Sequence, residues 1–100
     1  MIRSLRVHAD AAQELAEAVQ WYEARCQGLG REFFDAVVES VESLHRTPEI
    51  GTPLSVDRRT RRLVLPRFPY NVVYRLSPAE IVVVAVAHAR RRPGYWKHRH

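Results

Sequence analysis

The chain has 100 residues, of which 46% are apolar, and its formal net charge is +5. This length allows one domain with one hydrophobic core over residues 1–100, because two smaller units could not fold without metals or disulfides. The single cysteine excludes an internal disulfide. Arginines interrupt the apolar residues near the N-terminus, so we expect no secretory signal there. The longest apolar run is too short to cross a bilayer. We therefore expect a cytoplasmic protein with no membrane contact, no metal site and no cofactor.

The charge differs between the two halves of the chain. Residues 1–50 contain five arginines and nine acidic residues, a net charge of −4, whereas residues 51–100 contain ten arginines, one lysine and two acidic residues, a net charge of +9. This asymmetry predicts a basic functional surface in the second half, suited to nucleic acid or to an acidic protein partner.

A short strand at residues 2–7 and a long helix at residues 10–26 come first. Asp10 suits the start of this helix because of the helix dipole. Apolar residues of the helix recur at spacings of three and four, which indicates one buried stripe: Ala12, Leu15, Ala16, Val19, Tyr22 and Cys26. Cys26 is therefore interpreted as a buried packing thiol rather than a nucleophile. Three charged residues lie off the stripe: Glu14, Glu17 and Arg25.

A second helix is predicted at residues 31–45, after two glycines that favour the end of the first helix. Its inner face is apolar: Phe34, Val37, Val38, Val41 and Leu44. Its outer face is acidic: Glu32, Asp35, Glu39 and Glu42. The short connection predicts an antiparallel α-hairpin. Two prolines then make residues 47–53 a turn-rich exit.

The rest of the chain has the alternation that is typical of strands. Strands are predicted at residues 61–65 and 70–76, and Tyr70 and Tyr74 should pack on the helices without a catalytic role. Residues 81–88 (IVVVAVAH) are apolar on both faces, so they should lie centrally in the sheet, covered by helices on one side and by another segment on the other. The element order predicts an α+β domain with an N-terminal strand, an α-hairpin and a three-stranded antiparallel meander.

Several segments resemble those of the RelE/ParE superfamily, the toxins of type II toxin–antitoxin systems. The similar segments are residues 11–22 (AAQELAEAVQWY), 33–44 (FFDAVVESVESL), 48–51 (PEIG), 61–65 (RRLVL), 70–75 (YNVVYR) and 88–96 (HARRRPGYW). Together they cover nearly the whole chain in the order of the family. The resemblance implies a small twisted sheet and a toxin that a cognate antitoxin neutralises.

The superfamily has two main target classes, since RelE-like members cut mRNA on the ribosome and ParE-like members inhibit DNA gyrase. Metal-free RNA cleavage needs a base, a cation and an acid around the reacting phosphate. The resemblance offers four candidates for these roles: Arg62, Arg75, His88 and Tyr95. His88 ends a buried strand, however, where a structural histidine is commoner than a catalytic one. Lys97 is also the only lysine, and the acidic face of the second helix would repel RNA.

We therefore favour a ParE-like gyrase inhibitor without catalytic activity, and the long α-hairpin agrees with that class. A RelE-like endoribonuclease is the alternative, and a degenerate toxin that acts only as an antitoxin-binding co-repressor is the second alternative. Exposed aromatics beside arginines commonly mark contact surfaces. The expected target contacts are Arg90, Arg91, Arg92, Tyr95 and Trp96. Residues 98–100 are expected to be frayed and dispensable to folding.

The resemblance also implies a ParD-like antitoxin as partner, whose binding residues on this chain are unknown. Two helices leave part of the sheet face uncovered, and a partner helix or strand could complete that surface. An acidic antitoxin segment would match the charge of the Arg-rich half. We expect a heterotetramer of two toxins and two antitoxins, in which DNA is contacted only through the antitoxin.

Overall fold

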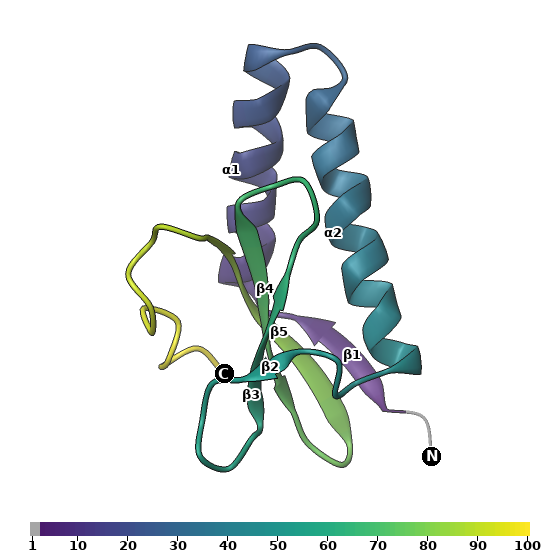
Figure 1. Cartoon of the computed structure of the whole chain (residues 1–100), viewed down its shortest axis with the longest axis vertical. Coiled ribbons are helices and arrows are strands. Elements are labelled where there is room, and N and C mark those ends of the chain that lie inside the picture. Colours follow the sequence, from purple (N-terminus) through teal and green to yellow (C-terminus); the bar gives the residue numbers. More distant parts are fainter. Residues whose placement is uncertain (1–2) are drawn as a thin grey trace.

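A short strand and a helical hairpin begin the chain. In this computed structural model, which describes residues 3–100, β1 (Ser4–Val7) leads into α1 (Ala9–Arg25), and α2 (Leu29–Arg46) returns beside it (Figure 1). The strand predicted at residues 2–7 is confirmed over the bounds of β1, and Ile2 lies outside the described residues. The predicted α-hairpin is also confirmed.

Glu23 and two glycines form the turn between the helices. Gly28 has a φ of 90°, a left-handed conformation that glycine adopts without steric cost. The Glu23 carboxylate accepts hydrogen bonds from the N–H groups of Gly28 and Gly30 at 2.9 and 3.0 Å, and it thereby caps the start of α2. A Cβ on Gly30 would lie 2.6 Å from the carbonyl oxygen of Val19, so the helices approach this closely only with glycine there.

Four further strands complete a mixed sheet. They are β2 (Thr52–Pro53), β3 (Thr60–Val64), β4 (Tyr70–Leu76) and β5 (Glu80–His88), and the strand order is β1-β5-β4-β3-β2. β1 pairs with β5 in parallel, and all other neighbours are antiparallel. The predicted meander is confirmed. β5 is an inner strand between β1 and β4, which agrees with its apolar sequence, although the middle strand of the sheet is β4. The sequence did not predict β2, because two residues are too few to show a period.

The main core lies between the helices and one face of the sheet. The Phe33 ring is fully buried and contacts the rings of Tyr22, Phe68 and Tyr70, with centroids 4.9 to 5.2 Å apart. Phe34, the residue predicted to face inward, is 40% exposed. Adjacent phenylalanines satisfy a spacing of three or four equally well, so the packing partners decide which of them is buried.

The buried side of α1 also differs from the prediction. Ala11 and Ala18 are buried, whereas Ala12 and Ala16 are exposed. Cys26 is exposed too, and its interpretation as a buried thiol is wrong because it follows the last residue of α1 at the tip of the hairpin. Among the described residues, neither helix combines the length and apolar composition needed to cross a bilayer.

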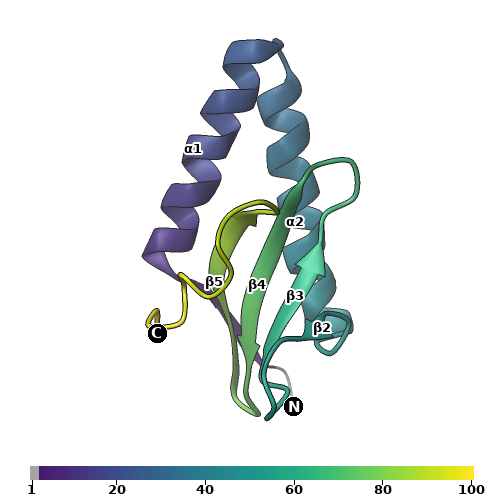
Figure 2. The same cartoon turned by 60° about the vertical axis from the view of Figure 1, so that its left-hand side comes forward.

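The segment that follows β5 covers the opposite face of the sheet (Figure 2). Trp96, which is 8% exposed, packs there against apolar side chains of β4 and β5: Val73, Val82, Val84, Ala85 and Ala87. Both faces of β5 are therefore buried, as predicted. The covering segment, residues 89–100, contains no helix or strand.

Tyr74 and Arg61 hold the loop between α2 and β3. The Tyr74 hydroxyl donates to the carbonyl oxygen of Pro48 at 2.7 Å and accepts from the N–H of Gly51 at 2.9 Å. The buried Arg61 side chain donates to the carbonyl oxygens of Glu49 and Gly51, each at 2.9 Å. These bonds order a loop that has few bonds of its own.

We predict that Tyr74→Phe lowers the free energy of unfolding by about 1–3 kcal/mol, because two polar backbone groups lose their partner away from water. Urea unfolding measures this loss. Tyr70→Phe is the matched control: the Tyr70 side chain is partly exposed, so this variant should lose little free energy of unfolding. Equal losses in the two variants would contradict the prediction.

Candidate functional site

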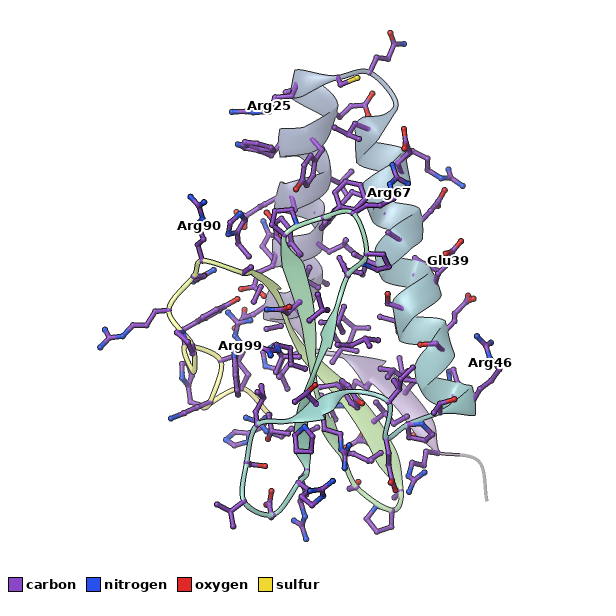
Figure 3. The ribbon with its side chains drawn as sticks, in the orientation of Figure 1. Arg25, Glu39, Arg46, Arg67, Arg90 and Arg99 are labelled. Carbon is purple, nitrogen blue, oxygen red and sulfur yellow. The ribbon has the colours of Figure 1, made fainter. Side chains whose placement is uncertain are left out.

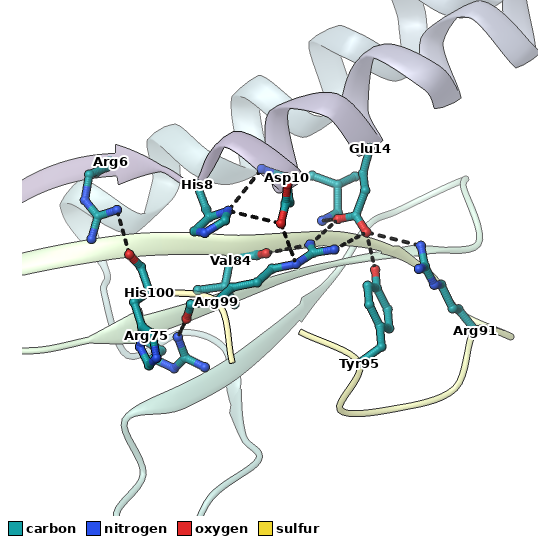
Figure 4. A network of polar contacts seen from close by, with 11 residues as sticks. Arg6, His8, Asp10, Glu14, Arg75, Val84, Arg91, Tyr95, Arg99 and His100 are labelled. Atoms are coloured by element: carbon teal, nitrogen blue, oxygen red, sulfur yellow. Dashed lines mark hydrogen bonds and ion pairs between the residues drawn. The ribbon is translucent and has the colours of Figure 1, made fainter. Parts of the chain in front are cut away.

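The Glu14 carboxylate connects α1 to the end of the chain (Figure 4). Its Oε1 accepts hydrogen bonds from the N–H of Val86 at 3.0 Å and from Arg99 Nη1 at 2.9 Å. Its Oε2 accepts from the Tyr95 hydroxyl at 2.7 Å, and from Arg91 Nη1 and Arg99 Nη2, each at 3.2 Å. The side chains of Glu14 and Arg99 are each 10% exposed. One largely buried carboxylate thus binds two guanidinium groups and a phenol, and such charge-assisted bonds are strong.

The end of the chain is held by further bonds to the sheet. Arg99 donates to the carbonyl oxygen of Val84 at 3.0 Å. Arg75 donates to the carbonyl oxygen of Lys97 at 2.7 Å and to that of Arg99. The prediction that residues 98–100 are frayed is therefore wrong, because the side chain and the carbonyl group of Arg99 are both bonded to other elements.

Tyr95 acts here as a hydrogen-bond donor. Burial raises the pKa of the Tyr95 phenol above its ordinary value, and the hydrogen bond to Glu14 raises this pKa further. The Arg91 guanidinium lies 3.6 Å from the centroid of the Tyr95 ring while it also bonds Glu14. A phenol with a raised pKa is a weak acid, so this arrangement suits positioning better than proton transfer.

Three of the four candidates for RNA cleavage share one small hollow. Arg62, His88 and Tyr95 line a space of about 90 Å³ beside the end of β5. Arg75 lines a different hollow and is bonded to the end of the chain. His88 Nδ1 accepts a hydrogen bond from the N–H of Arg90 at 3.0 Å, which stabilises the turn after β5. Within residues 3–100, no cluster of side chains is arranged to hold a metal ion.

The predicted target contacts divide into exposed cations and less accessible aromatics. Arg90, Arg91 and Arg92 are exposed, and Arg90 points away from the body of the protein (Figure 3). Arg91 belongs to the network above, whereas Arg90 and Arg92 form no ion pair within the described part of the chain. Tyr95 is half-buried and Trp96 is buried, so the expectation of exposed aromatics is wrong for Trp96.

Sequence reasoning missed Glu14 and Arg99. Glu14 lies off the predicted apolar stripe, where a glutamate is usually solvated, and Arg99 lies in a segment that was expected to fray. The two residues are 85 positions apart. No local pattern pairs them: α1 packs on β5, and the segment after β5 folds back over the sheet, where Arg99 reaches both Glu14 and the carbonyl oxygen of Val84.

An apolar groove of about 310 Å³ lies between the helices, β1 and β5. Its lining includes Leu5, Val7, Leu15, Phe34, Val38 and Val41. Val7 is 43% exposed and Phe34 is 40% exposed. Exposed apolar side chains gathered in one groove are typical of a contact surface.

Comparisons with known proteins find similarity to one toxin family. The sequence profile of the ParE toxin of the type II toxin–antitoxin system parDE matches residues 5–93. A solved structure of the chromosomal ParDE TA system from P. aeruginosa has a similar fold, with a TM-score of 0.74 and 23% sequence identity over 89% of this chain and 98% of that chain. No curated protein matches the sequence.

Burial raises the pKa of each of the four tyrosines: Tyr22, Tyr70, Tyr74 and Tyr95. A phenol that ionises less readily in the folded state stabilises the fold below its unfolded pKa of about 10, and this stabilisation is lost as the pH rises further. We predict that tyrosinate absorbance appears above about pH 10 together with loss of the far-UV circular dichroism. Tyr95→Phe should reduce the dependence on pH. Tyrosinate formed by the folded protein below that pH would contradict the prediction.

Proposed function

The chain belongs to the ParE family of type II toxins, and we propose that it binds DNA gyrase, inhibits supercoiling and so arrests replication. The observation that carries this proposal is the row of exposed arginines, residues 90–92, on a segment that Glu14 holds in place. A row of cations on a fixed segment suits an acidic protein surface, because complementary charge steers binding and sets its orientation. This mode of action makes and breaks no bond, and it requires no catalytic residue.

The acidic face of α2 also supports a protein target over the ribosome. Its four carboxylates are exposed: Glu32, Asp35, Glu39 and Glu42. Glu32 and Asp35 pair with nearby arginines, whereas Glu39 points outward from α2 (Figure 3). Binding to RNA depends on neutralising phosphates with cations, and this face has an excess of negative charge.

Ribosome-dependent mRNA cleavage is the second candidate, because Arg62, His88 and Tyr95 do line one hollow. In that function Tyr95 would have to leave its bond to Glu14 before it could protonate a leaving group. A toxin that serves only as an antitoxin-binding co-repressor is a third candidate. Expression of the chain alone without growth arrest would support that third candidate.

We predict that replacing both Arg90 and Arg92 by Ala weakens inhibition of gyrase supercoiling about tenfold, since the loss of two interface charges costs about 1.4 kcal/mol. A supercoiling assay with purified toxin measures the concentration for half inhibition. The double variant Arg25→Ala and Arg46→Ala removes the same charge from other exposed positions and should inhibit normally. Failure of the unmodified toxin to inhibit gyrase, together with mRNA cutting on ribosomes, would overturn the proposal.

We also propose that the antitoxin of this toxin covers the apolar groove with an amphipathic helix. The groove presents Val7 and Phe34 to solvent, and Glu42 and His45 provide polar groups in its lining. An apolar helix face with polar flanks fits such a surface. The second half of the chain would attract an acidic antitoxin extension, and a complex of two toxins and two antitoxins that contacts DNA through the antitoxin remains our expectation.

Val38→Asp should weaken antitoxin binding by about 30-fold, or about 2 kcal/mol, because a charge replaces an apolar contact in the groove. Calorimetric titration with the cognate antitoxin measures the change in Kd. Val64→Asp is the matched control, since Val64 is 60% exposed on β3 and does not line the groove. Equal affinities of the two variants would exclude the groove as the binding site.

A further inference from the structure

The contacts of Glu14 indicate a role in target binding as well as in folding. Resting on the proposed function, we propose that Glu14 is a positioning residue: it fixes the segment of residues 89–100 and thereby sets the direction of Arg90 and Arg92. It does so through three side chains of that segment, Arg91, Tyr95 and Arg99.

The segment cannot hold its position through its backbone alone. Its internal backbone bonds are short-range turns, such as Arg91 N–H to His88, Lys97 N–H to Gly94 and Arg99 N–H to Trp96, each at 3.0 or 3.1 Å. Within residues 3–100 no strand of the sheet pairs with it, and the Ala89 N–H, which donates to the carbonyl oxygen of Pro69 at 2.7 Å, ties only its start to another part of the backbone. Beyond Ala89 its placement therefore depends on side-chain contacts: burial of Trp96, the bonds to Glu14, and the bonds of Arg75 and Arg99 to backbone carbonyl groups.

Glu14 is well suited to be the fixed end of these contacts. It is part of α1, and its Oε1 is bonded to the N–H of Val86 in β5, so two regular elements determine where the carboxylate lies. Its partners in the segment stand at positions 91, 95 and 99, which spreads the attachment along most of its length.

The fixed position of Arg91 also determines where Arg90 and Arg92 lie. Its guanidinium is bound between the Glu14 carboxylate and the Tyr95 ring, which fixes the chain between Arg90 and Arg92. The neighbouring arginines are free of ion pairs within the described residues and exposed. A contact surface that is already ordered loses less conformational freedom when it binds, so fixing this segment increases affinity.

Glu14→Gln tests the proposal, because the amide keeps the shape of the side chain but loses the charge that binds two arginines. Trp21→Phe serves as the background, so that Trp96 is the only tryptophan. We expect iodide to quench Trp96 more strongly in the variant, and we expect inhibition of supercoiling to weaken about tenfold or more. Glu17→Gln, three positions along α1 on an exposed site, removes the same charge and should change neither value.

Three comparisons separate positioning from a loss of stability. Val37→Ala destabilises the main core without touching the network, and it should leave both values unchanged in fully folded protein. The double variant Glu14→Gln and Arg99→Met removes the largely buried guanidinium together with the carboxylate, while Asp10, the second carboxylate beside Arg99 at 3.6 Å, is exposed and stays hydrated; this variant should still inhibit weakly. When Arg90 and Arg92 are already Ala, Glu14→Gln should weaken inhibition little further, since a residue that acts through those arginines gives non-additive effects.

Normal inhibition by Glu14→Gln, or an additive effect in the last comparison, would overturn the proposal. Growth arrest on expression of each variant gives the same comparison without assuming the target. If the unmodified toxin arrests growth but does not inhibit gyrase, the proposed function fails. The role of Glu14 is then decided by whether Glu14→Gln, unlike Glu17→Gln, exposes Trp96 and relieves the arrest.

Discussion

The hydrogen bonds to the Glu14 carboxylate determine where residues 89–100 lie and which arginines of this segment are exposed. The Glu14 side chain is 10% exposed, so its carboxylate loses much of its hydration, which costs free energy. Hydrogen bonds from five donor groups replace the water and offset this desolvation cost. The same bonds place residues 89–100 on the sheet. Because β5 is apolar on both faces, without that cover one face of this inner strand would be open to water.

Different parts of the chain therefore cover the two faces of the sheet. The helices cover one face and leave the apolar groove open beside β1, whereas the last segment covers the other face and carries the exposed arginines. Two elements that line the groove, α2 and β1, lie on one side of β5 in Figure 1, and the segment that carries Arg90 lies on the other side (Figures 1 and 3). An antitoxin helix in the groove would therefore leave Arg90 accessible. Neutralisation under the proposed function then needs a second antitoxin segment that reaches the basic side.

Much of the fold could be predicted because its periodic patterns are strong. The bounds of β4 agree with the predicted residues 70–76, and the place of β5 inside the sheet follows from its apolar run. The predictions of buried residues are wrong where two neighbouring residues of a helix fit the same apolar spacing. Ala11 rather than Ala12 is buried, and Phe33 rather than Phe34, because α1 and α2 pack on each other as well as on the sheet. Spacing within a helix defines a stripe but leaves its rotation to the neighbouring elements.

The candidate site was predictable only in its charge. The arginine run at residues 90–92 is visible in the sequence, but Glu14 and Arg99 each look like solvated surface residues, and their pairing depends on contacts across 85 positions. The end of the chain was expected to be frayed for the same reason, since local sequence shows neither the anchor of Arg99 nor the surface that buries Trp96. Aromatic and basic residues in this segment thus have separate roles: Trp96 supplies buried area that holds the segment on the sheet, and the arginines supply the charge that it presents.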